Sequence, residues 1–177
     1  MSLIKIIPPE HAQGLLAETY QEIQHTFGSI PNAMQLGSAS PHLLSARWQA
    51  TRYFREHPTL SMALQATIRM LVSAENDCDY CVDFNASMLI NYCGQTLEQV
   101  TATRQDPSQT PLPAKDKSLL SFVLKALHTA AAVSADDIAE CHALGWTDGD
   151  MLDAVTLAAN NRAVDMILNT FKVERDF

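Results

Sequence analysis

Apolar residues recur at intervals of three and four along almost the whole 177-residue chain, and this spacing constrains the fold more than any other feature. Residues spaced in this way line one face of an α-helix, whereas a half-buried strand requires strict alternation of apolar and polar residues. The sequence contains no sustained alternation bounded by hairpin turns. We therefore predict an all-α fold, a compact multi-helix bundle.

Proline and glycine mark where the predicted helices begin and end. Proline is favourable in the first turn of a helix, and glycine is favourable just after the last turn. Read with the apolar spacing, these residues predict helices over about 9–27, 41–57, 59–74, 77–93, 96–105, 114–131, 134–144 and 147–171. Asp77 is the expected N-cap of the fourth of these helices.

The length and composition of the chain suit a single domain. With 47% of its 177 residues hydrophobic, the chain can enclose one sizeable core without disulfides. The clearest interruption is the segment DPSQTPLPAKD, whose three prolines exclude a continuous helix. We expect one helical domain over 1–177, with a Pro-rich connection near 106–114.

The net charge and the lengths of the apolar runs limit which partners and which cellular location we expect. The chain has 20 acidic and 12 basic residues, a formal net charge of -8, and no basic cluster, so we expect no nucleic-acid partner. No run of eighteen apolar residues occurs, and Pro8 and Pro9 interrupt the N-terminal apolar run before it reaches the length of a secretory leader. We expect no membrane association and a cytoplasmic location, where most thiols are kept reduced.

A Cys-x-x-Cys pair, Cys78 and Cys81, opens the helix predicted over 77–93. Unpaired N–H groups and the helix dipole favour a thiolate there, and the three-residue spacing brings both sulfurs to one side. Zinc ligation and simple core filling are alternative interpretations of such a pair. A structural zinc site needs two further ligands, and a second C-x-x-C or an H-x-x-x-H is missing, so we expect no metal.

The stretch LQATIRMLVSAENDCDYCVDFNASML resembles the core of the alkylhydroperoxidase D and carboxymuconolactone decarboxylase superfamily. The segments FGSIPN, SASPHLL and LGWTDGDMLDAVTLAANNRAVDMI resemble the peroxidase-related branch of that superfamily, so the resemblance covers nearly the whole chain. It implies an AhpD-like helical fold and association of copies into a homo-oligomer.

The resemblance also implies roles for individual residues. Cys81 would be the attacking thiol and Cys78 the thiol that resolves the oxidised intermediate. The family has a glutamate twelve residues before the first cysteine and a histidine four residues after the second, but this chain has Ala66 and Asn85 there. Asn85 can orient a group by hydrogen bonding, although it cannot exchange protons as an imidazole does. Glu75, the nearest carboxylate in the preceding turn, is the candidate base.

Acidic residues gather around the pair, and negative neighbours disfavour a thiolate. We therefore expect a less acidic thiol and weaker peroxide chemistry than in relatives with the full set of residues. The acidic neighbours are Glu75, Asp77, Asp79 and Asp83.

These features favour a thiol-dependent peroxidase or disulfide reductase that acts on a peroxide or a small disulfide. No flavin, haem or nicotinamide fingerprint occurs, so we expect no cofactor, and electrons would come from a lipoyl or thioredoxin-like dithiol protein. The missing glutamate and histidine leave open a non-catalytic helical scaffold or a redox sensor. A carboxymuconolactone decarboxylase-type enzyme is a further alternative.

Overall fold

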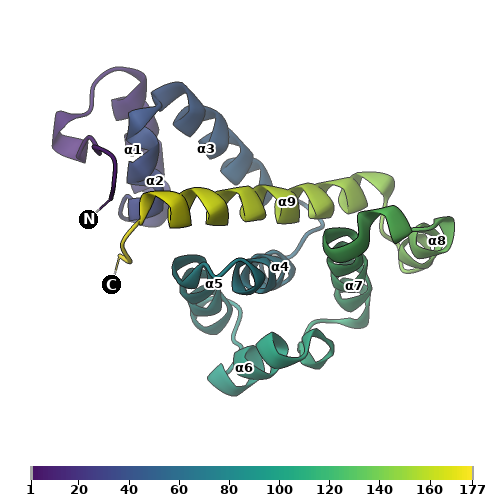
Figure 1. Cartoon of the computed structure of the whole chain (residues 1–177). Coiled ribbons are helices and arrows are strands. Elements are labelled where there is room, and N and C mark those ends of the chain that lie inside the picture. Colours follow the sequence, from purple (N-terminus) through teal and green to yellow (C-terminus); the bar gives the residue numbers. More distant parts are fainter. Residues whose placement is uncertain (1, 177) are drawn as a thin grey trace. The chain divides into compact units, whose positions relative to one another are not determined.

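The computed structural model describes residues 2–176, and within them every regular element is a helix (Figure 1). The predicted all-α class is therefore confirmed. Short 3-10 turns lie at Pro9–His11, Leu36–Ala39, Pro107–Gln109 and Ala130–Ala132. The α-helices are α1 (Leu15–Phe27), α2 (Asn32–Gln35), α3 (Pro41–Arg55), α4 (Met62–Glu75), α5 (Asp79–Asn91), α6 (Leu97–Gln105), α7 (Ala114–Thr129), α8 (Ala135–Ala143) and α9 (Asp148–Phe171).

Two compact units make up the chain. The first contains the residues up to His57 together with those from Ile167 onward, and the second is Pro58–Met166. None of the helices within residues 2–176 has both the length and the apolar character needed to cross a membrane.

The first unit has its own core between α1 and α3. The side chains of Tyr20, Ile23 and Trp48 are buried there, and the Trp48 indole N–H donates to Glu22 over 2.7 Å. The predicted helix from residue 9 begins later than expected. Only Pro9–His11 forms a 3-10 turn, which ends at the extended Ala12, and Gly14, with a φ of +54°, is the N-cap from which α1 starts at Leu15.

The second unit is organised around α4, most of which is buried. Ser61 caps this helix, because its hydroxyl accepts from the Leu64 backbone N–H. α4 packs most extensively against α5, which runs beside it in Figure 1. The Pro-rich connection over 106–114 lies within this unit, and the 3-10 turn Pro107–Gln109 is its regular element.

The turn between α4 and α5 sets the position of the two cysteines. The expected N-cap, Asp77, is wrong by one residue: Asp77 has a φ of +52°, in the left-handed region, and Cys78 is the N-cap. Reversing direction in so short a turn requires one left-handed residue, and Asp tolerates that conformation better than most. Cys81 is then the third helical residue, so the two side chains occupy the positions that face each other in a capping box.

The apolar layer among α4, α5 and α6 supports this turn. Its buried members are Ala66, Met70, Val82, Leu89 and Val100. Leu89→Ala removes most of a fully buried side chain from this layer and should lower the free energy of unfolding by about 2–5 kcal/mol in urea denaturation. Leu97→Ala, at a side chain that is 69% exposed, should change it by less than about 0.5 kcal/mol. Equal losses in the two variants would contradict this placement of the core.

Candidate functional site

The two sulfurs of the Cys-x-x-Cys pair lie together at the start of α5. The Cys81 and Cys78 Sγ atoms are 2.9 Å apart and share a hydrogen bond. Both side chains are buried, with 1% of Cys78 and 6% of Cys81 exposed. A disulfide requires about 2.05 Å, so the sulfurs need to approach by less than about 1 Å to form one.

The shared hydrogen bond divides the acidity unequally between the two thiols. The hydrogen bond with Cys81 lowers the pKa of Cys78 below its ordinary value, and the Cys81 backbone N–H adds a smaller lowering against the effect of burial. The pKa of Cys81 is raised far above its ordinary value, first because of the hydrogen bond with Cys78 and then because of burial. The pair therefore releases one proton readily and retains the second.

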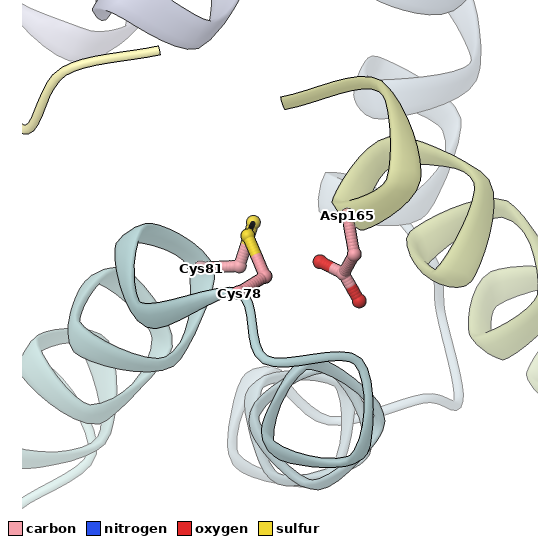
Figure 2. A group of neighbouring side chains, drawn as sticks. All are labelled: Cys78, Cys81 and Asp165. Atoms are coloured by element: carbon pink, nitrogen blue, oxygen red, sulfur yellow. Dashed lines mark hydrogen bonds between the residues drawn. The ribbon is translucent and has the colours of Figure 1, made fainter. Parts of the chain in front are cut away.

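A buried carboxylate, Asp165 on α9, lies beside the sulfurs (Figure 2). One of its oxygens and the two Sγ atoms all lie within 4.8 Å of one another, and the residue is 0% exposed. Its negative charge raises the pKa of both Cys78 and Cys81. Asp165 is not one of the acidic residues that lie near the cysteines in the sequence.

Neutral side chains hold Asp165 in place. The Ser73 hydroxyl donates to Oδ1 over 2.9 Å, the Asn76 amide donates to Oδ2 over 3.2 Å, and the Asn161 amide donates to Oδ2 over 3.2 Å. The Asn161 amide also donates to Ser73 Oγ over 2.8 Å. Among residues 2–176, no basic side chain is a partner of this carboxylate, so a buried negative charge is compensated only by dipoles.

Cys78, Cys81 and Asp165 are all of types that can ligate metals, and they form one buried group. Two thiolates bound to one tetrahedral zinc ion at about 2.3 Å each would be about 3.8 Å apart. The observed 2.9 Å between the sulfurs is much shorter. The geometry therefore suits a dithiol that closes to a disulfide better than a pair of zinc ligands.

Ala66 and Asn85 occupy the positions where the related family has glutamate and histidine. Ala66 is fully buried on α4 and packs in the apolar layer. Asn85 is buried on α5, where its amide donates to the Cys81 carbonyl oxygen over 2.8 Å, one turn earlier in the same helix. The Asn85 side-chain N–H therefore bonds to the α5 backbone at Cys81.

Glu75, the predicted base, lies at the exposed end of α4. Its Oε1 is 2.7 Å from His128 Nε2, and both side chains are at the surface. The structure thus pairs Glu75 with an exposed histidine and brings Asp165 to the buried thiols.

The two remaining cysteines lie outside the pair. Cys93 is half-buried against the apolar layer, and burial raises its pKa. Cys141 on α8 is buried, and burial with nearby Glu140 and Asp137 raises its pKa.

The sequence contains a signal for Asp165 outside the Cys-x-x-Cys segment, in the apolar spacing of α9. The buried positions of α9 within the second unit are Asp150, Met151, Ala154, Leu157, Ala158, Asn161 and Asp165. Their spacing of three and four residues places Asn161 and Asp165 on a largely apolar stripe, far from the helix start where Asp150 accepts from Thr147. A polar residue on such a stripe must find buried partners, and an unexplained carboxylate there is a candidate for function.

Comparison with known proteins shows which fold the chain has. No family model matches the chain. An alkyl hydroperoxide reductase of Mycobacterium tuberculosis is 30% identical over 93 residues, which are 52% of this chain but 27% of the relative, so the chain spans about a quarter of that protein's length.

Solved structures match over more of the chain. An uncharacterized peroxidase-related protein of Ralstonia eutropha, described as an alkylhydroperoxidase AhpD core, superposes with a TM-score of 0.86 at 20% identity over 99% of this chain and 92% of its own. An uncharacterized peroxidase-related protein of Silicibacter sp. gives a TM-score of 0.79 at 19% identity, over 97% and 94% of the two chains. The predicted AhpD-like fold is therefore confirmed, and the chain is a helical protein with the AhpD-core fold and a Cys-x-x-Cys pair at a helix start.

The hydrogen bonds around Asp165 should contribute measurably to stability. Ser73→Ala removes a donor to this carboxylate and an acceptor for Asn161, and we expect the free energy of unfolding to fall by about 1–3 kcal/mol in urea denaturation. Ser108 provides a matched control, because its hydroxyl donates to Asp106 over 2.8 Å at the surface. Ser108→Ala should cost about 0.5 kcal/mol or less. A Ser73→Ala protein as stable as wild type would contradict the network.

Proposed function

We propose that this chain is a thiol-dependent oxidoreductase that reduces a peroxide or a small disulfide with its Cys78–Cys81 dithiol. The observation that carries the proposal is the buried sulfur pair, 2.9 Å apart at the start of α5. The names of the similar proteins, which refer to peroxidases and alkyl hydroperoxide reduction, favour a peroxide as the oxidant.

The proposed reaction begins with loss of one proton from the dithiol. The resulting thiolate is more stable on Cys78, but the two sulfurs are 2.9 Å apart and can exchange the remaining proton. Cys81 is the more exposed of the two, 6% against 1%, so we propose that it makes the attack. With most of the sulfur surface covered, a small oxidant such as hydrogen peroxide or a short alkyl hydroperoxide reaches it best.

Attack forms a bond from Cys81 sulfur to the terminal peroxide oxygen and breaks the oxygen–oxygen bond, so the other oxygen leaves as an alcohol or water after taking up a proton. Cys78 sulfur then displaces the oxygen from the sulfenic acid, which leaves as water, and the disulfide forms. Two thiols are oxidised and one peroxide is reduced. A partner protein with a lipoyl or thioredoxin-like dithiol returns the disulfide to the reduced state.

We propose supporting roles for the surroundings of the pair. Asn85 positions the attacking residue, because its side-chain amide donates a hydrogen bond to the Cys81 carbonyl oxygen.

We infer a cytoplasmic location, where such dithiol reductants are active. We also propose that copies of the chain associate through helical faces, since Leu152 and Met166 on α9 are largely exposed apolar side chains.

Counting free thiols by mass after addition of one equivalent of hydrogen peroxide tests the proposal. Wild type should lose two thiols rapidly as the Cys78–Cys81 disulfide forms. Cys81→Ser should not lose its remaining Cys78 thiol rapidly, whereas Cys78→Ser should stop at a sulfenic acid that dimedone traps. Cys141→Ala should behave as wild type, because that buried cysteine is outside the pair.

The thiol count, together with assays of turnover with a dithiol reductant and of decarboxylation, separates the alternatives. Wild type that keeps both thiols under peroxide would contradict the proposed enzyme and favour a non-catalytic scaffold. A redox sensor would form the disulfide once but would not turn over with a dithiol reductant. A decarboxylase-type enzyme would keep its activity in both serine variants.

A further inference from the structure

We propose that Asp165 is the proton acceptor and donor for the dithiol, the role for which this chain has neither the family's glutamate nor its histidine. The inference rests on the proposed dithiol chemistry and adds to it a residue on a different helix, α9. Three observations support it: the position of the carboxylate, the nature of its partners, and the charge balance of the reaction.

The position of Asp165 suits proton transfer. Its carboxylate oxygen lies within 4.8 Å of both sulfurs, a separation that direct approach or one intervening water spans. Figure 2 shows the two cysteines at the start of α5 and the Asp165 side chain opposite them on α9. No other described group of buried cysteine, histidine or carboxylate side chains within residues 2–176 brings three such residues together.

Among the described residues, Asp165 is held by hydrogen bonds and not by an ion pair. From α4, Ser73 and Asn76 donate hydrogen bonds, and from α9 itself Asn161 does so; all three are neutral. From α5, the titratable groups beside it are Cys78 and Cys81. A carboxylate fixed by a basic side chain would resist protonation, because the cation would lose its partner, whereas one held by neutral donors loses no ion pair when it takes up a proton.

The charge balance of the reaction is the third reason. With Asp165 ionised, formation of a thiolate by loss of a proton to solvent would place a second negative charge in a buried site, and the two charges would repel each other. If the proton moves from the thiol to Asp165 instead, the site keeps a single negative charge throughout. The carboxylate that hinders a free thiolate is thus well suited to receive its proton.

The proton then serves both chemical steps. When Cys81 sulfur attacks the peroxide, protonated Asp165 gives its proton to the departing oxygen and becomes a carboxylate again. When Cys78 sulfur attacks the sulfenic acid, Asp165 takes the Cys78 proton and passes it to the oxygen that leaves as water. Each proton that departs with an oxygen atom comes from one of the two thiols, so the site ends with its original charge.

Asp165→Asn tests this inference in the full-length chain, with two rates measured from pH 6 to pH 10: disulfide formation with hydrogen peroxide, and alkylation of the pair by iodoacetamide. Removing the negative charge should make the thiols ionise at lower pH, so alkylation should rise at lower pH than in wild type. Disulfide formation near pH 7 should nevertheless slow by about tenfold or more, because the proton acceptor is lost, and the deficit should shrink as the pH rises. More thiolate with slower oxidation is a combination that a merely structural role does not produce.

Asp150→Asn is the matched control, because Asp150 is also a buried aspartate of α9, hydrogen-bonded to Thr59 and Thr147. Its oxidation and alkylation profiles should be those of wild type. If Asp165→Asn does not fold, Asp165→Glu and Asp165→Gln repeat the comparison, and only the glutamate variant should keep the wild-type pH dependence.

The remaining outcomes overturn the inference in distinguishable ways. Asp165→Asn oxidising as fast as wild type or faster at pH 7 would show that the carboxylate only repels the thiolate. A deficit of equal size at every pH, shared by Asp150→Asn, would show a structural role. Wild type that does not react with peroxide would remove the proposed function and this inference with it, and the alkylation profiles would still show whether Asp165 acts on the thiols.

Discussion

The buried carboxylate of Asp165 constrains this site more than any other group. An ionised side chain that is 0% exposed must be compensated, and here the compensation comes from Ser73, Asn76 and Asn161, which tie α9 to the end of α4. The same end of α4 leads through Asp77 into the cysteines. The hydrogen bonds that make the carboxylate tolerable therefore also fix its position relative to the dithiol.

Two pairs of effects then act on the Cys78 thiol in opposite directions. The S–H···S hydrogen bond and the start of α5 favour a first thiolate, on Cys78, while burial and Asp165 oppose it. The hydrogen bond with Cys78, burial and Asp165 all raise the pKa of Cys81, so the pair retains its second proton. Such a pair holds one thiolate and one proton between its two sulfurs, and exchange of that proton over 2.9 Å is the step that lets Cys81 make the proposed attack.

The local signals in the sequence predicted most of the fold. Pro41, Gly28 and the Thr96 cap mark helix ends that the structure reproduces, because each acts within one turn of the backbone. The cap at Cys78 was missed by one residue, because the left-handed Asp77 depends on how α4 and α5 pack. Asp165 was missed altogether: it lies far from the cysteines in sequence, and only the folding of α9 against α4 brings it to them. Glu75, chosen for being near in sequence, faces His128 at the surface.

The sharing of one proton between two buried sulfurs is the claim on which the rest depends, and titration of thiolate absorbance in the ultraviolet tests it most directly. Cys93→Ala with Cys141→Ala removes the two other thiols, so that the signal comes from Cys78 and Cys81 alone. The structure predicts two separate steps, the first below the range of an ordinary cysteine and the second far above it. A single step in which both sulfurs ionise together at the value of a free cysteine would contradict the account.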